Sequence, residues 1–386
     1  MTSQKIRLSR RTLLAGAVLT TGTAALAVSR PIQAAQSSLL MNKQIYGPSP
    51  GIAKLNANEN PYGPSPEALK AMSQAIQKGA YYANDSAERL KTMIAERHEL
   101  TKDHIMITSG SSGALTYLAM AASEKGHILG PDLFWDTTSK MGARNSSFGI
   151  KHLAKTKDLS IDLTKMYNSI TPETALVQIT NPNNPTGLTL EASALKTFCL
   201  KASEKTMVLV DEAYNELSDD PDANNMIPLI KEGKNIAVAR TFSKIYGLAG
   251  LRIGYMIARP ETIQMASKFS LGDYSLNIAG LAAAISSYND FTFLKYSKTK
   301  ILEGRQMLTD ALEANGLAAL PTQTNFMFVD LGSIDAEKFR AAMFEEGVMI
   351  RGIYRDYNNW SRVSMGKLPD IQKYIDALPK VLDQFS

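Results

Sequence analysis

The stretch Arg240-Thr-Phe-Ser-Lys-Ile-Tyr-Gly-Leu-Ala-Gly-Leu-Arg-Ile-Gly-Tyr255 holds a single lysine shortly after an apolar segment. Hydroxyl groups flank this lysine, Lys244, at Thr241 and Ser243, and Arg252 follows eight residues later. Hydroxyl and guanidinium groups bind anions, and a guanidinium can hold a phosphate through two hydrogen bonds. The stretch therefore predicts an amine held beside a phosphate group.

Apolar and amphipathic segments alternate along the chain on both sides of this stretch. The apolar runs 175–180, 207–210 and 236–239 predict buried strands, and the helices expected between them would cover both faces of a mostly parallel sheet. We therefore expect an α/β fold. In such a sheet, ligands bind beyond the carboxyl ends of the strands. This rule brings together the residues that end or follow the expected strands, which are 109–113, Asn184, Asp211, Tyr214 and Lys244.

The turn 109–113, Ser-Gly-Ser-Ser-Gly, follows an expected strand at 105–108 and precedes an expected helix. Ser111 and Ser112 would lie at the helix N-terminus, where free N–H groups and the helix dipole attract anions. Such a turn often only connects two elements, so it is weak evidence alone. Together with Lys244 it predicts pyridoxal phosphate, a cofactor that has an aldehyde for a lysine and a phosphate for an anion site.

We divide the chain into four parts: 1–35, a leader; 36–66, an arm and loop; 67–289, a large cofactor-binding domain; and 290–386, a smaller α/β domain. Three prolines and a glycine in 55–66 exclude helix and central strand there. That segment is expected to be an ordered loop over the site, or else a plain linker.

The net charge of +5 comes from the leader, which holds five basic residues and no acidic one. Without them the 42 basic residues fall to 37, equal to the 37 acidic residues. We therefore expect neither a nucleic-acid partner nor a stable association with a membrane. The single cysteine, Cys199, excludes an internal disulfide and lies among apolar residues, which predicts that it is buried.

The leader, with Ser9-Arg-Arg-Thr-Leu-Leu14 before a weakly apolar run to Val28, resembles a twin-arginine export signal. The resemblance implies that the protein folds and binds its cofactor in the cytoplasm, passes the twin-arginine translocase and works in the periplasm. Cleavage is expected near Ala34 or Ala35, with Ala27 as another position. A disordered basic N-terminus and an uncleaved anchor are the alternatives.

Five segments in this order and spacing resemble the aspartate-aminotransferase fold type of pyridoxal-phosphate enzymes. Within this type, they resemble the histidinol-phosphate aminotransferase-like group. They are 55–66, 181–187 (Asn-Pro-Asn-Asn-Pro-Thr-Gly), 210–214, Ser243-Lys244 and Gly250-Leu-Arg252. The resemblance covers about 41–386. It implies a large domain with a mostly parallel seven-stranded sheet between helices and a smaller α/β domain built mainly from the C-terminal part.

The resemblance implies a role for each matching residue. Lys244 would form the Schiff base with the cofactor and move the substrate proton, and Asp211 would pair with the pyridine nitrogen. Trp135 would stack on the ring in preference to Phe134, although the surrounding run departs from the family pattern. The other implied cofactor contacts are Asn184 and Tyr214 at the phenolic oxygen and Ser111, Ser112, Thr241, Ser243 and Arg252 at the phosphate. No metal is expected.

The family also implies substrate contacts and a homodimer with shared active sites. Arg362 would bind the substrate α-carboxylate and Arg351 a distal phosphate, although Arg351 could equally be a surface or structural residue. Asn60 and Tyr62 would cover the substrate. Tyr82, with Tyr81 as a substitute, would reach the phosphate of the neighbouring subunit, from a turn that lacks the proline usual in the family.

We expect a transaminase that exchanges an amino group between an amino acid, or a phosphorylated amino alcohol, and a 2-oxo acid by a ping-pong mechanism. A decarboxylase or a β-eliminating lyase of the same fold is the alternative. A non-catalytic protein that binds pyridoxal phosphate is disfavoured because the set of expected site residues is intact.

Overall fold

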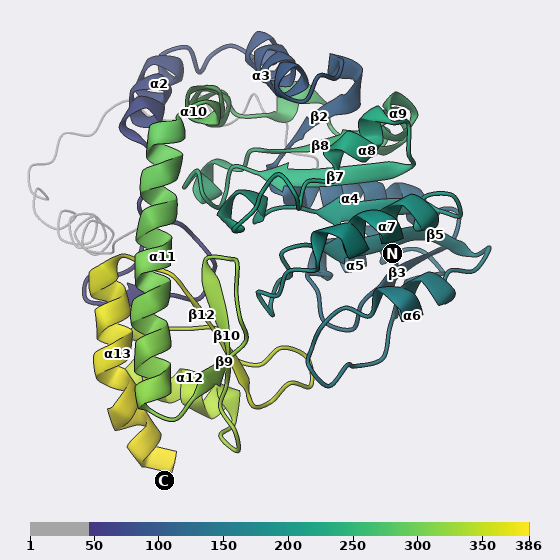
Figure 1. Ribbon diagram of the computed structural model, residues 1–386. Helices are drawn as coiled ribbons and strands as arrows, with labels where there is room; N and C mark the ends of the chain where they lie inside the picture. Colours follow the sequence, from purple (N-terminus) through teal and green to yellow (C-terminus); the bar gives the residue numbers. More distant parts are fainter. Residues whose placement is uncertain (1–45, 386) are drawn as a thin grey trace, which may run out of the picture. The chain divides into compact units, whose positions relative to one another are not determined.

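The computed structural model describes residues 46–385, shown as coloured ribbon in Figure 1. The chain divides into Met1–Ser49 and Pro50–Ser386, and the description below concerns the second part. The predicted export signal lies outside the described residues. Within 46–385, no helix combines the length and the apolar character that crossing a membrane requires.

A seven-stranded sheet forms the centre of the larger α/β part (Figure 1). Its strand order is β2-β8-β7-β6-β5-β3-β4, and β8 runs antiparallel to both of its neighbours while the remaining pairs are parallel. The prediction of a mostly parallel seven-stranded sheet is confirmed. The strands are β2 (Ile105–Thr108), β3 (His127–Gly130), β4 (Ile150–His152), β5 (Thr174–Thr180), β6 (Met207–Asp211), β7 (Ile236–Thr241) and β8 (Gly254–Ala258).

Both faces of this sheet are buried, because successive strand residues point to opposite sides. On β6, Val208 and Val210 belong to one core cluster, while Leu209 belongs to another. The second cluster contains Leu115 and Leu118 of helix α4 (Gly110–Ser123), which packs against β2, β7 and β8. The other helices of this part are α3 (Asn84–Arg97), α5 (Thr137–Ala143), α6 (Leu163–Asn168), α7 (Ala192–Ala202), α8 (Ile227–Lys231) and α9 (Pro260–Ser267).

The C-terminal part is a second α/β layer built on the antiparallel sheet β12-β10-β9. The long helix α11 packs along α13 beside this sheet (Figure 1). A two-stranded parallel pair joins β1 to β11, so Ala53 lies opposite Val348. The elements of this part are β1 (Ala53–Lys54), α11 (Phe291–Ala314), β9 (Ala318–Ala319), β10 (Phe326–Asp330), α12 (Ala336–Glu345), β11 (Val348–Met349), β12 (Trp360–Ser364) and α13 (Leu368–Leu382). Helices α2 (Pro66–Ile76) and α10 (Ile278–Tyr288) pack on each other, and α10 also packs on α3 of the larger part.

The starts of two elements are defined by their backbone. Helix α3 begins at Asn84 after Ala83, which makes no side-chain cap. Arg252 has left-handed backbone angles, and β8 begins two residues later at Gly254. The division into domains at 66/67 and 289/290 stays a prediction.

Candidate active site

A cavity of about 570 Å³ opens at the carboxyl ends of the parallel strands. Its floor comes from β6, β7 and the turns that follow β5 and β6, and its wall comes from the segment between β11 and β12. The structure therefore brings together most of the residues predicted from the sequence. They are Ser111, Ser112, Trp135, Asn184, Asp211, Tyr214, Thr241, Ser243, Lys244, Arg252, Arg351 and Arg362.

Lys244 lies three residues after the end of β7, where the chain leaves the sheet edge. Its Nζ donates a hydrogen bond to the carbonyl oxygen of Asn58, 3.1 Å away. Burial lowers the pKa of Lys244 to about 8, and the positive charge of Arg362 adds to this effect. Because its pKa is lowered towards neutral pH, the amine can act as nucleophile and base where an ordinary lysine would stay protonated.

Asp211 ends β6 with its carboxylate at the cavity, and it accepts a hydrogen bond from the N–H of Ala213 at 3.2 Å. Its neighbour Glu212 points to the opposite side, where it accepts hydrogen bonds from the N–H of Met226 and the guanidinium of Arg240. Asp211 and Glu212 thus point to opposite sides, as neighbouring residues of a strand do. Burial raises the pKa of Asp211 to about 7, so a cationic partner is needed to keep this carboxylate ionised.

Arg362 is buried and joins two segments of the cavity wall. Its Nη1 donates to Oδ1 of Asn184 at 2.7 Å, and its Nη2 donates to the carbonyl oxygen of Asn56 at 3.1 Å. Tyr214 lies near this group, and its hydroxyl oxygen accepts a hydrogen bond from the amide of Asn58 at 3.0 Å. Asn184, Tyr214 and Arg362 are therefore held by neighbours before any ligand binds.

The predicted phosphate cup is formed where β2, β7 and β8 approach each other. Ser111 and Ser112 lie in the first turn of α4, and the hydroxyl of Thr241 donates to Oγ of Ser243 at 2.9 Å. The left-handed backbone of Arg252 (φ 54°) turns its guanidinium back to Ser243, whose Oγ lies 3.3 Å from Nη1. These donors converge on one side of the cavity.

Glycine at two positions allows this convergence. A Cβ on Gly110 would lie 2.3 Å from Nη2 of Arg252, and one on Gly254 would lie 2.3 Å from the backbone nitrogen of Ser111. Gly110 also has a φ of +67°, which favours glycine. The close packing of backbone around the guanidinium has the form of an anion cradle.

Comparison with known proteins agrees with this geometry. The family model for aminotransferases of class I and II matches residues 50–378, which is most of the chain. This chain is a class I and II aminotransferase. The curated histidinol-phosphate aminotransferase 1 of Cupriavidus pinatubonensis is 33% identical over 341 residues, covering 86% of this chain and 89% of the relative.

Two solved structures resemble this aminotransferase closely. The histidinol-phosphate aminotransferase of Sinorhizobium meliloti, solved in complex with pyridoxal-5'-phosphate, has a TM-score of 0.79 and 30% identity. The match covers 94% of this chain and 100% of the Sinorhizobium meliloti chain. A histidinol-phosphate aminotransferase assigned as putative, from Erwinia carotovora atroseptica, has a TM-score of 0.82 and 30% identity over 86% of this chain and 96% of that one. The chain thus shares the fold of these enzymes over most of their length.

The family makes pyridoxal phosphate the cofactor of this aminotransferase, and the residues present fit it. An amine of lowered pKa, a buried carboxylate and an anion cradle all face one cavity. Lys244 would hold the aldehyde carbon, Asp211 the pyridine nitrogen and Arg252 the phosphate. When bound, the cofactor supplies the electron sink that stabilises negative charge at the substrate Cα.

The structure separates the two aromatic candidates for stacking on the cofactor ring. Trp135 lines the cavity, whereas Phe134 is buried with its ring 5.6 Å from that of His152. Phe134 also packs over Gly130, where a Cβ would lie 2.4 Å from the ring. The position of Trp135 agrees with the role that the resemblance implies.

Asn60 and Tyr62, which we expected to cover the substrate, do not line the cavity. The amide of Asn60 donates to the carbonyl oxygen of Ile245 at 2.8 Å and to Oγ of Ser297 at 2.6 Å. The hydroxyl of Tyr62 accepts a hydrogen bond from the N–H of Leu368 at 3.1 Å. Both side chains hold the proline-rich loop in place, and residues 56–59 of this loop face the cavity instead.

Sequence reasoning missed Asn58 and Tyr354, which both line the cavity. Asn58 has a φ of 55°, a conformation that asparagine tolerates better than most residues. An asparagine in a proline-rich loop was therefore a usable signal of a left-handed backbone. Tyr354 had no such signal, because it lies in an irregular segment between two short strands. Tyr82 is 80% exposed and does not line the cavity of its own chain.

Proposed function

We propose that this aminotransferase prefers amino donors that carry a second anionic group, a carboxylate or a phosphate, at the end distant from the amino group. Glutamate and aspartate have this form. Histidinol phosphate has a single anionic group, its phosphate, and would use only one of the two anion positions. The observation that supports the proposal is the pairing of Arg351 with Arg362 across one edge of the cavity.

Arg351 and Arg362 face each other on paired backbone segments. Each residue donates its N–H to the carbonyl oxygen of the other, at 3.0 Å and 3.1 Å. The ring of Tyr354 lies 5.3 Å from each guanidinium carbon. Arg362 is buried and Arg351 is exposed, so one cation lies deep in the cavity and the other at its mouth. Two fixed guanidinium groups can hold two anionic groups of one substrate.

The chain's own residues support the amino-group exchange. Arg362 would hold one anionic group of the substrate, so that the amino group faces Lys244. The amine of Lys244 would then take the proton from Cα of the amino donor. In the second half of the exchange it would return a proton to Cα of the newly formed amino acid. Asp211, buried at the floor, would keep the ring nitrogen cationic. Residues 56–59 and Tyr354, which also line the cavity, would restrict the access of water to it.

Donors in matched pairs test the proposal. The pairs are glutamate with glutamine, aspartate with asparagine, and histidinol phosphate with histidinol, because each differs mainly in one anionic group. The charged member of at least one pair should have a kcat/KM at least about tenfold higher, which corresponds to about 1.4 kcal/mol. Arg351→Gln should remove most of that ratio while leaving the rate with the neutral member within about threefold.

Equal rates for the charged and neutral donors, or a ratio that survives Arg351→Gln, would reject the preference. Product analysis in the same assays distinguishes the reaction type. Transamination gives a 2-oxo acid from the amino acids, or a ketone from histidinol and histidinol phosphate, together with an aminated acceptor. Carbon dioxide with an amine, or ammonia without an acceptor, would instead indicate the decarboxylase or lyase.

We also propose a homodimer in which each subunit completes the site of the other. Tyr81 and Tyr82 are 73% and 80% exposed, an unusual state for two adjacent aromatic residues, and they lie in the connection between α2 and α3. Sedimentation should give twice the chain mass. Mixing Lys244→Ala with Tyr82→Ala subunits should restore activity, since one site of each hybrid dimer is then intact. A monomer, or a mixture without gain, would contradict this arrangement.

For location, we propose export through the twin-arginine translocase. The supporting features are Arg10-Arg11, the weakly apolar run behind them and the small residues at 34–35. Fractionation of cells that make the full chain should place a shortened protein outside the cytoplasm, and the change of Arg10 and Arg11 to lysine should retain the full-length protein inside. Full-length protein in the cytoplasm of both strains would disprove export.

A further inference from the structure

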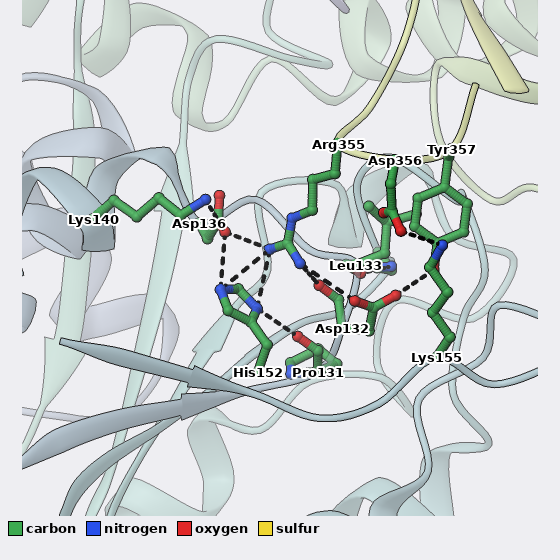
Figure 2. Close-up of polar contacts among 11 residues, drawn as sticks. Pro131, Asp132, Leu133, Asp136, Lys140, His152, Lys155, Arg355, Asp356 and Tyr357 are labelled. Atoms are coloured by element: carbon green, nitrogen blue, oxygen red, sulfur yellow. Dashed lines mark hydrogen bonds and ion pairs between the residues drawn. The ribbon is translucent and has the colours of Figure 1, made fainter.

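A turn of the C-terminal part reaches the loop that carries Trp135. The turn is Tyr354–Tyr357, closed by a hydrogen bond from the N–H of Tyr357 to the carbonyl oxygen of Tyr354, and it lies just before β12. The loop is residues 131–136, which follow β3 at the edge of the cavity. Figure 2 shows the side chains of Arg355 and Tyr357 extending from the turn towards this loop. We call the contact between the two segments the latch.

Arg355 makes most of the polar contacts of the latch (Figure 2). Its Nη1 donates to the backbone oxygen of Asp132 and lies 3.4 Å from Oδ1 of the same residue. Its Nη2 donates to Oδ2 of Asp136. One guanidinium therefore bridges both ends of the loop.

His152 and Lys140 complete the surroundings of Asp136. Nδ1 of His152 lies 3.0 Å from Nη2 of Arg355, and Nζ of Lys140 lies 2.9 Å from the Asp136 carboxylate. Burial and the charge of Arg355 hold the pKa of His152 below its usual value, so the ring is neutral at pH 7 and does not repel the guanidinium.

Tyr357 adds a second anchor. Its hydroxyl donates to Oδ2 of Asp132, and its ring lies 4.1 Å from Nζ of Lys155, which pairs with Asp356 at 2.6 Å. The same ring belongs to a small buried cluster with Leu133 and Phe328. Polar and apolar contacts thus join the turn to the loop at several points.

The latch joins two segments that each contribute a residue to the lining of the cavity. Trp135 precedes Asp136 in the loop, and Tyr354 precedes Arg355 in the turn. The left-handed backbone of Arg355 (φ 51°) sends its side chain to the loop while Tyr354 faces the cavity. Because Arg355 and Asp136 directly follow Tyr354 and Trp135 in the chain, their ion pair constrains the spacing of these two cavity residues.

Burial makes the latch stronger than an ordinary surface ion pair. Exposed pairs contribute about 0–1 kcal/mol. Here the side chain of Asp136 is only 10% exposed and that of Arg355 is 25% exposed, and Arg355 contacts two carboxylates and a backbone oxygen at once. A network of this kind holds one geometry where single exposed pairs do not.

We propose that Arg355 is a positioning residue that sets the width of the substrate cavity by holding the Tyr354 turn against the Trp135 loop. Arg355 itself is not among the residues that line the cavity. Its loss should therefore weaken substrate binding more than it slows the chemistry at Lys244. The kinetic part of this inference rests on the proposed transaminase substrates, and the structural part does not.

The kinetic test compares Arg355→Ala with Arg340→Ala. Arg340 pairs with Glu337 within helix α12 and bridges no two segments, so it is a matched control for the loss of one arginine ion pair. For the best donor found in the paired screen, Arg355→Ala should raise KM about tenfold and change kcat less than about threefold. Arg355→Lys can reach only one carboxylate at a time, so its KM should lie between those of the wild type and Arg355→Ala. An unchanged KM, or a loss confined to kcat, would overturn the proposal.

A second test needs no substrate, so it separates failure of this inference from failure of the proposed function. The chain has two tryptophans, Trp135 and Trp360, and Trp360→Phe keeps a ring against Phe328 while leaving Trp135 as the only reporter. In that background, Arg355→Ala should at least double the acrylamide quenching of Trp135 in the cofactor-free protein, and Arg340→Ala should not change it. Equal quenching in all three proteins would overturn the latch. If Arg355→Ala does not fold, Arg355→Lys and Asp136→Asn give the same comparison.

Discussion

The Nζ of Lys244 and the carbonyl oxygen of Asn58 lie 3.1 Å apart, although 186 residues separate them in the sequence. The same asparagine donates from its side-chain amide to Tyr214 and accepts at Oδ1 from the hydroxyl of Ser364 at 2.7 Å. One buried residue of the proline-rich loop therefore contacts the lysine, a residue expected at the cofactor and the C-terminal sheet. Its backbone oxygen contacts Lys244, whereas its side chain contacts Tyr214 and Ser364. A substitution can therefore remove the side-chain contacts and keep the backbone contact.

Asn58→Gly and Asn58→Ala should both lower kcat, because both remove the hydrogen bond to Tyr214 while the carbonyl contact to Lys244 remains. Only Asn58→Ala places a Cβ without a compensating side-chain hydrogen bond at a φ of 55°. It should therefore be about 1 kcal/mol less stable than Asn58→Gly. Urea unfolding and steady-state rates of the two variants check this. Equal stability, or unchanged kcat in both, would contradict the division of roles.

Gly110→Ala should weaken cofactor binding by tenfold or more, because the new Cβ would displace the guanidinium of Arg252 from the phosphate cup. Gly233→Ala is the control, since Gly233 has a φ of +79° and open space around it. Both variants carry the cost of a non-glycine residue in the left-handed region, about 1 kcal/mol. Titration of the cofactor-free proteins with pyridoxal phosphate should separate them, and equal affinities would show that the cup does not need Gly110.

Asp211→Asn should lower kcat by at least about a hundredfold, since the amide cannot keep the ring nitrogen cationic. The same change should stabilise the cofactor-free protein at pH 8. Burial raises the pKa of Asp211 to about 7, so between the ordinary value near pH 4 and pH 7 the folded state holds a proton that the unfolded state has lost. Stability of the wild type relative to Asp211→Asn should thus fall as pH rises through this window. Thermal unfolding from pH 4.5 to 8 measures it, and a constant difference would disprove the assigned cause.

Cys199 should not react with a thiol reagent in the native protein. It is fully buried in α7, and burial raises its pKa to about 12. One thiol per chain should appear on unfolding, so the rate of modification in mild denaturant reports opening of the core beneath this helix. Rapid modification without denaturant would show that α7 opens easily.

The positions of these site residues could be predicted from the sequence because they lie at or just after the ends of strands. Asp211 and Lys244 follow apolar runs that are visible in the sequence, and parallel strands bring their carboxyl ends to one edge of the sheet. The choice of Asp211 over Glu212 needed only the alternation of side chains along a strand. These features follow from local sequence and one rule of topology.

The C-terminal wall could not be predicted in the same way. Tyr354 and Arg355 lie in an irregular segment whose course depends on contacts with residues more than 200 positions away. A tyrosine or an arginine in such a segment looks like any exposed residue, and the left-handed backbone of Arg355 has no glycine or asparagine to mark it. The side-chain directions of Asn60 and Tyr62 could not be read from the sequence for a related reason. The loop was expected at the site, but which of its side chains turn inward is decided by its partners in α11 and α13.

The pairing of β1 with β11 has a consequence for the biosynthesis of the enzyme. Residues 56–59 reach their places only when Ser364 and Arg362 have been made, and the N–H of Asn58 contacts Ser364 across 306 residues. At translation rates of about 5–20 residues per second, the proline-rich loop waits about 15–60 s for these partners. The central sheet can fold first, but the cavity has no C-terminal wall during this interval. We therefore expect cofactor loading to follow completion of the chain, so that a nascent chain halted before β12 captures no pyridoxal phosphate stably.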